Sequence, residues 1–210
     1  MRMATQPPAG GSAAWGDLIA QRARGVADSV ARTIAYPAVT PNLLTVVGFL
    51  LTCGVALLIA EGRPLLGGVL VIVVGLFDML DGAMARVSGR KTRFGGFLDS
   101  TLDRCSEAVL LAGVYWAHQS PEIGLLVIWV LAGSLMVSYA RARAESLQVN
   151  CEVGLLPRPQ RVVVLATGLI VAGALEDALY LTVALGVLAV FTTITTLQRI
   201  LHTRRALEGR

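Results

Sequence analysis

Four aspartates lie at helical spacing in an apolar sequence, and carboxylates in such a setting are candidates for chemistry. Asp78 and Asp81 are three residues apart, and Asp99 and Asp103 are four apart, so each pair shares one helix face. Unpaired carboxylates held close together repel one another. A hard cation removes this repulsion, and oxygen ligands with open positions for phosphate suit Mg²⁺ or Mn²⁺. We therefore predict a divalent metal site; interhelical salt bridges are the alternative.

Glycine and arginine accompany these aspartates. Gly82 and Gly95 each cost a helix about 1 kcal/mol relative to alanine. Close approach of a ligand to the backbone explains such glycines, and tight helix packing is the other explanation. Arg86 lies two turns after Asp78 on the same face and can bind phosphate through two parallel hydrogen bonds. The pattern predicts chemistry on a metal-bound phosphate.

The elements that must position these residues are membrane helices. The 210-residue chain is 55% hydrophobic and only 15% charged, whereas a soluble domain is about 25% charged. The third apolar stretch contains Asp99 and Asp103, so a hydropathy profile underrates it and five spans is the competing count. We predict an all-α membrane protein with six transmembrane helices of about 20 residues each. Their expected bounds are 43–60, 66–88, 96–117, 123–147, 159–176 and 178–201.

Four segments follow from the composition along the chain. Residues 1–12 are rich in proline, glycine and small residues and are predicted to be a disordered tail. Residues 13–36 alternate apolar and charged side chains at helical spacing, which predicts an amphipathic helix on the membrane surface. A helix packed on a soluble partner is the alternative. Residues 37–203 form the six-helix transmembrane domain, and 204–210 a basic C-terminal tail.

The positive charges determine the expected orientation. With the N-terminus in the cytoplasm, all but Arg63 of the 18 lysines and arginines fall on the cytoplasmic side of a six-span topology. A five-span topology would move the C-terminal arginines to the wrong face. We therefore expect a multi-pass protein of the cytoplasmic membrane, with both termini and the site facing the cytoplasm. The net charge of +4 is explained by this distribution, so no nucleic-acid partner is expected.

The aspartates, glycines and arginine of this region form one continuous pattern. It reads Asp78-x2-Asp81-Gly82-x2-Ala85-Arg86-x8-Gly95-x3-Asp99-x3-Asp103. This pattern resembles the signature of the CDP-alcohol phosphatidyltransferase family, and the six spans after an amphipathic helix extend the resemblance over nearly the whole chain. The family moves a phosphatidyl group from a CDP-activated lipid to an alcohol and releases CMP. The resemblance also implies a homodimer.

The resemblance assigns roles to the matching residues. It implies one or two metal ions, Mg²⁺ with Mn²⁺ possible: Asp78, Asp81 and Asp99 bind one, and Asp78, Asp99 and Asp103 contribute to a second. Asp103 is also the expected general base for the acceptor hydroxyl. The expected contacts to the CDP-lipid are Pro41, Asn42, Leu43, Leu44, Gly82, Arg86, Thr92 and Gly95.

Three further segments resemble bacterial phosphatidylinositol phosphate synthases. They are Phe77–Arg86 with Thr92–Gly95, Ser138–Glu145, and Arg158–Arg161 together with Gln198–His202. In those enzymes a basic pocket binds the phosphate of inositol phosphate, and the matching positions here are Ser138, Arg141, Arg161 and Arg199. The position of Arg141 is often lysine there, and arginine binds phosphate with a planar fork instead of a point charge.

The expected reaction joins CDP-diacylglycerol and inositol 1-phosphate to give phosphatidylinositol phosphate. Glycerol 3-phosphate, which gives phosphatidylglycerophosphate, is the alternative acceptor because it also carries a phosphate; another alcohol of the family remains open, as does an archaeal ether lipid as donor. The arginines could instead serve only topology or contact anionic lipid. A non-catalytic scaffold or small transporter is the remaining reading, and it predicts that Asp103→Asn leaves function intact.

Overall fold

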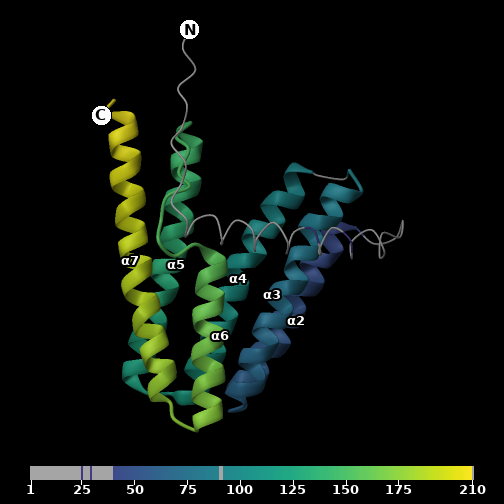
Figure 1. The fold of residues 1–210 in the computed structure, drawn as a ribbon, viewed down its shortest axis with the longest axis vertical. Helices are drawn as coiled ribbons and strands as arrows, with labels where there is room; N and C mark the ends of the chain where they lie inside the picture. The colour runs from purple at the N-terminus through teal and green to yellow at the C-terminus, as the bar shows by residue number, and fades with distance from the viewer. Residues whose placement is uncertain (1–24, 26–28, 30–39, 90–91, 210) are drawn as a thin grey trace.

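The computed structural model describes residues 25, 29, 40–89 and 92–209, and the described residues form six long helices (Figure 1). The expected tail at 1–12 and, apart from two residues, the expected amphipathic helix at 13–36 lie outside the described residues. The helices are α2 (Pro41–Ala60), α3 (Pro64–Val87), α4 (Arg93–His118), α5 (Pro121–Ser146), α6 (Arg158–Leu175) and α7 (Leu179–Leu207). The all-helical prediction is confirmed.

Short polar caps set where three of the helices begin. The side chains of Thr40, Thr92 and Ser120 accept hydrogen bonds from backbone N–H groups in the first turns of α2, α4 and α5. Proline occupies the first turn of α2, α3, α5 and α6, where no N–H is needed. The predicted bounds agree to within three residues except at one end. Helix α7 continues through Leu207, so residues 204–207 extend this helix instead of forming a separate tail.

The six described helices form a closed ring. Each packs against two neighbours, in the order α2, α3, α6, α7, α5 and α4, and α4 then returns to α2. Helices α4 and α6 face each other across the ring, and no Cα atom of one lies within 8 Å of a Cα atom of the other. The main hydrophobic core lies inside the ring and draws on all six helices, with residues such as Ile59, Val114 and Leu185 almost fully buried.

Five of the described helices are long and apolar enough to cross a bilayer: α2, α3, α5, α6 and α7. Helix α4 does not meet this criterion because acidic and basic side chains occupy its first half. It is nevertheless 26 residues long and packs between α2 and α5 within the ring. The chain is thus a multi-pass membrane protein.

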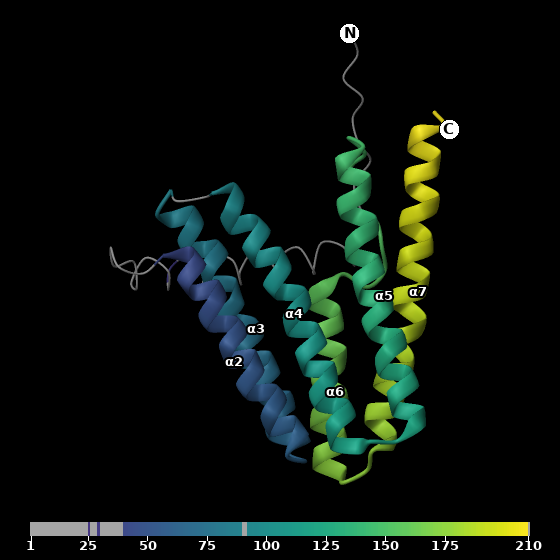
Figure 2. The same ribbon diagram turned by 180° about the vertical axis from the view of Figure 1, so that it is seen from behind.

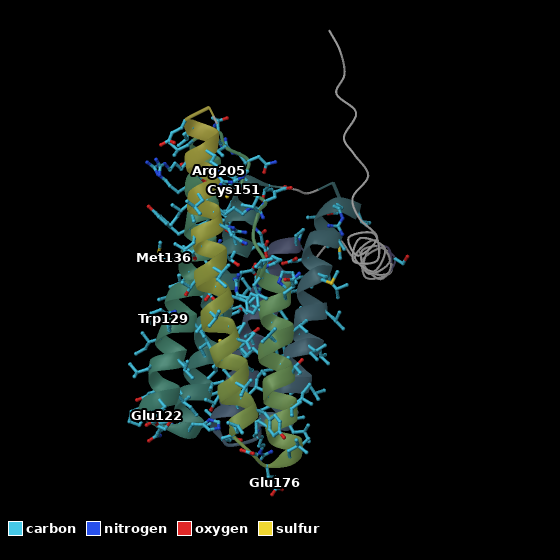
Figure 3. All side chains as sticks on the ribbon, turned by 60° about the vertical axis from the view of Figure 1, so that its left-hand side comes forward. Glu122, Trp129, Met136, Cys151, Glu176 and Arg205 are labelled. Carbon is cyan, nitrogen blue, oxygen red and sulfur yellow. The ribbon has the colours of Figure 1, made fainter. Side chains whose placement is uncertain are left out.

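The helices alternate in direction, so the basic residues collect at one end. Helices α2, α4 and α6 begin there and α3, α5 and α7 end there; we call this the basic end. In Figure 3, Arg205 and Cys151 lie toward it, whereas Glu122 and Glu176 lie at the opposite end. Helices α4 and α5 diverge toward the basic end (Figure 2). The ends of these two helices are therefore farthest apart at the basic end.

Glycine in α3 serves packing within the chain. A Cβ on Gly68 would lie 2.8 Å from the backbone oxygen of Ala166 and 2.9 Å from the backbone nitrogen of Ile170, both in α6. Only glycine allows α3 and α6 to approach this closely. Gly68 thus serves a contact between two helices of the same chain.

Candidate active site

The four aspartates lie near the basic end, two on α3 and two on α4, with α2 packed between these helices. Helix α2 therefore shapes their surroundings. Thr45 of α2 donates a hydrogen bond of 2.7 Å to Oδ2 of the buried Asp81, and the backbone N–H of Gly82 contacts the other carboxylate oxygen. Gly48 of α2 leaves room for Asp78, since a Cβ at this position would collide with its Oδ1 atom. Thr45 thus orients the carboxylate of Asp81, and Gly48 makes room for that of Asp78.

A first cavity of about 260 Å³ lies between the start of α2, the end of α3 and the start of α4. Six residues predicted to contact the CDP-lipid line it: Pro41, Asn42, Gly82, Arg86, Thr92 and Gly95. Asp81 and Asp99 contribute carboxylates to the same wall. Leu43 and Leu44 are not part of this lining, and Leu43 is exposed on the outside of α2.

Close packing explains Gly95 in the first cavity. A Cβ there would lie 2.9 Å from Oδ1 of Asn42 and 3.0 Å from Oγ1 of Thr92. The Thr92 hydroxyl also caps α4 by accepting a hydrogen bond of 2.9 Å from the Gly95 N–H. Gly82 has more space, because the nearest atom to its Cβ position is a guanidinium nitrogen of Arg86 at 3.5 Å. The two glycines therefore keep the cavity wall free of side chains.

A second, larger cavity of about 570 Å³ adjoins the first and opens between α4 and α5. The four residues predicted to bind the acceptor phosphate all line it: Ser138, Arg141, Arg161 and Arg199. Asp103 and Arg158 also line this cavity. Gly96 and Asp99 line both cavities, so the two spaces meet beside an aspartate of the signature.

The arginines of the second cavity differ in how firmly they are held. Arg161 is buried and forms a forked ion pair with Glu107, with nitrogen–oxygen distances of 2.9 and 3.1 Å. Arg199 is also buried, and it donates hydrogen bonds to the carbonyl oxygens of Val137 and Val153. Arg141 is more exposed and pairs at 2.7 Å with Glu145 on its own helix.

The donor set fits a hard divalent cation. All four aspartates supply oxygen, and their charges interact with one another across α3 and α4. Within the described part of the chain, however, no three acidic, histidine or cysteine side chains are grouped closely enough to form a ready metal centre. Asp78 and Asp103 contact Arg158 instead, at 3.4 and 2.9 Å. Metal ligation therefore requires these carboxylates to turn toward a common point.

Sequence reasoning missed three residues of the site. Thr45 lies one turn after Pro41 in α2 and holds Asp81, and Glu107 lies one turn after Asp103 and holds Arg161. Helical spacing from predicted site residues could have found both. Arg158 belongs to a segment that carried the resemblance, but nothing in the sequence pairs it with Asp78, which is 80 residues away.

The fold and these two cavities define a class of protein, and the comparisons with known proteins agree. The model of the CDP-alcohol phosphatidyltransferase family matches residues 38–195. The chain belongs to this family. The resemblance predicted from the aspartate signature is thereby confirmed.

Relatives and solved structures place the chain near one branch of the family. The archaetidylinositol phosphate synthase of Methanothermobacter thermautotrophicus is 39% identical over 182 residues, which cover 86% of this chain and 90% of that protein. The phosphatidylinositol phosphate synthase of Mycobacteroides abscessus is 33% identical, with 88% and 86% covered. The crystal structure of the Mycobacterium tuberculosis phosphatidylinositol phosphate synthase with CDP-DAG bound superposes with a TM-score of 0.78 at 33% identity, covering 85% of this chain and 93% of that one. A structure of that enzyme with manganese and citrate gives 0.77 at 34% identity, covering 84% and 88%.

Proposed function

We propose that the protein transfers the phosphatidyl group of CDP-diacylglycerol to the hydroxyl of inositol 1-phosphate and releases CMP. The observation that carries this proposal is the meeting of two cavities at Asp99. One cavity holds the residues expected to contact the CDP-lipid, and the other combines arginines with Asp103. The similarity to synthases of phosphatidylinositol phosphate and archaetidylinositol phosphate supports an inositol phosphate acceptor.

The first cavity suits the pyrophosphate of the donor. Arg86 offers a planar guanidinium fork, and Gly82 and Gly95 leave the backbone accessible to a bulky group. The aspartates of α3 and α4 would hold Mg²⁺ or Mn²⁺, one ion or two. Such a metal supplies charge neutralisation at the phosphates, which favours departure of CMP. Manganese bound by the similar mycobacterial enzyme supports this assignment.

The second cavity suits a phosphorylated acceptor. Ser138, Arg141, Arg161 and Arg199 surround a polar space large enough for a phosphorylated polyol, and Asp103 lies on its wall. Asp103 accepts the proton of the acceptor hydroxyl as its oxygen attacks the phosphorus of the phosphatidyl group. The new phosphorus–oxygen bond forms while the bond to CMP breaks. A phosphorylated acceptor needs a basic pocket, whereas a neutral acceptor does not.

The membrane arrangement is part of the proposal. All six helices span the bilayer, with α4 tolerated because its charged half faces the polar cavities. The basic end faces the cytoplasm, as expected from the positive-inside rule, and the protein resides in the cytoplasmic membrane. The outer faces of the helices carry exposed apolar side chains that suit contact with lipid. We also propose a homodimer, which rests on the family resemblance.

An acceptor panel tests this proposal. Purified protein in detergent is given CDP-diacylglycerol and Mg²⁺ with inositol 1-phosphate, inositol or glycerol 3-phosphate, and CMP and lipid product are measured. We expect product with inositol 1-phosphate and little with the others. Product with glycerol 3-phosphate and none with inositol 1-phosphate would instead identify a phosphatidylglycerophosphate synthase. Release of no CMP with any acceptor would contradict an enzymatic function for the chain.

A further inference from the structure

Arg158 of α6 contacts signature aspartates on two other helices, α3 and α4. It is the first residue of α6, and its Nη2 atom lies 2.9 Å from Oδ1 of Asp103 and 3.4 Å from Oδ2 of Asp78. No Cα atoms of α4 and α6 come within 8 Å of each other. The long side chain of Arg158 therefore spans the ring to reach Asp103 on α4, and it also contacts Asp78 on the neighbouring helix α3.

One donor of this guanidinium remains unused. The Nε atom of Arg158 is buried and has no hydrogen-bond partner among the described residues, although the side chain as a whole is 31% exposed and lines the second cavity. A buried donor without a partner carries a free-energy cost. Such a cost is expected where a ligand oxygen completes the site, and the cavity is where the phosphorylated acceptor is proposed to bind.

Arg161, one turn further along the same face of α6, provides a contrast. Its guanidinium donates to both oxygens of Glu107 and to the carbonyl oxygen of Leu156, and only 4% of its side chain is exposed. Arg161 thus has a fixed partner that is not a signature aspartate. Within the described part of the chain, Arg158 pairs with the signature aspartates Asp78 and Asp103, so the same residue type is used differently at the two positions.

We propose that Arg158 is a positioning residue for the transfer reaction: it orients the carboxylate of Asp103 toward the acceptor and opposes metal binding at Asp78. This inference rests on the proposed function. Its physical basis is that Arg158 already contacts the Asp78 carboxylate and has the same sign of charge as a divalent cation that this carboxylate would help to hold. A metal ion held by Asp78 would weaken this contact and leave Arg158 paired with Asp103.

The first test measures metal binding without any substrate, so its outcome does not depend on the identity of the acceptor. Mn²⁺ affinity is measured by electron paramagnetic resonance on purified wild type, Arg158→Gln, Arg158→Lys and Arg161→Gln. Removing a unit charge this close to a divalent ion changes its affinity on the order of tenfold. We expect tighter Mn²⁺ binding in Arg158→Gln and near wild-type binding in Arg158→Lys, which keeps the charge.

Arg161→Gln is the matched control because it removes the same charge from the same helix, one turn from Arg158, at a side chain that pairs with Glu107 and not with a signature aspartate. We expect it to lower the unfolding temperature while changing Mn²⁺ affinity much less than Arg158→Gln does. A purely structural cross-link at Arg158 predicts the same behaviour for both glutamine variants. Unchanged or weaker Mn²⁺ binding in Arg158→Gln would overturn the proposal.

A kinetic measurement tests the second part. Loss of the group that orients the base lowers kcat by about 100-fold, and we expect this for Arg158→Gln, with the KM for CDP-diacylglycerol little changed. Arg158→Lys should recover part of kcat. Equal kcat in Arg158→Gln and wild type would contradict a positioning role. If wild type itself releases no CMP, the proposed function fails, and the Mn²⁺ experiment still decides whether Arg158 opposes the metal.

Discussion

The two halves of the site satisfy their charges in opposite ways. On α3 and α4 the charges of the four aspartates interact with one another, and Arg158 of α6 contacts two of them. Three other arginines of α5, α6 and α7, which we call the basic wall, are held by Glu145, by Glu107 and by backbone carbonyl oxygens: Arg141, Arg161 and Arg199. Under the proposed function, the first half receives a cation and the basic wall receives an anion.

This difference suggests that the two halves of the site have separate functions. Carboxylates that repel one another gain from a metal and can rearrange when it binds, whereas arginines fixed by carboxylates and carbonyls keep their geometry before the acceptor arrives. The donor chemistry shared by the family would then reside in α2, α3 and α4. The choice of acceptor would reside in α5, α6 and α7. The following changes test that division, beginning with the largest expected effect.

Substitution Asp103→Asn should nearly abolish transfer. The asparagine keeps the shape of the side chain but cannot accept the proton of the acceptor hydroxyl, which corresponds to a loss of about 10²–10⁴-fold in kcat. CMP release in detergent with Mg²⁺ measures the effect, and Glu122→Gln at the opposite end of the molecule serves as the control. An Asp103→Asn variant that retains a large share of wild-type kcat would contradict the role of base.

Substitution Glu107→Gln should destabilise the fold. It removes one partner of the buried pair with Arg161, which typically costs about 3–5 kcal/mol because an uncompensated charge remains. Unfolding in detergent measures the loss. Glu208→Gln is the matched control, since it breaks the exposed pair with Arg204, for which about 0–1 kcal/mol is expected. Equal losses in both variants would show that the Glu107–Arg161 pair does not stabilise the basic wall.

Substitution Thr45→Val should weaken metal binding. The hydroxyl of Thr45 orients the carboxylate of Asp81, and loss of a hydrogen bond to a metal ligand typically costs about 10–100-fold in metal affinity. Titration with Mn²⁺ measures the change. Thr52→Val is the control on the same helix, because the Thr52 hydroxyl bonds only to the carbonyl oxygen of Gly48 one turn earlier. If both variants bind Mn²⁺ equally, Thr45 has no part in the metal site.

The helices, and the placing of the aspartates on shared helix faces, could be predicted from the sequence because both depend on short-range patterns. Apolar runs and caps such as Thr92 define the helices, and Asp78, Asp81, Asp99 and Asp103 repeat at the spacing of helix turns. Of the eight residues that the family resemblance assigns to the CDP-lipid, six line the first cavity together. Leu43 was included only because it lies within the matching segment, and its side chain is on the outside of the helix.

Contacts across the ring were beyond the reach of sequence patterns. The order of the helices in the ring brings α6 opposite α4, and no local spacing shows that Arg158 reaches Asp78 and Asp103. The pairing of Arg161 with Glu107 was missed for the same reason. Gly48 likewise looks like any glycine in an apolar helix until α2 is packed beside Asp78.

The steady-state KM values of Arg141→Gln show whether the acceptor and the donor are bound by separate halves of the site. Arg141 is the most exposed arginine of the acceptor set and pairs only with Glu145 of its own helix, so its removal disturbs the fold least. Loss of one charged contact to phosphate corresponds to about a tenfold weaker interaction. We expect the KM for inositol 1-phosphate to rise by this amount while the KM for CDP-diacylglycerol stays close to wild type. An equal rise in both KM values, or a rise for the donor alone, would contradict this expectation.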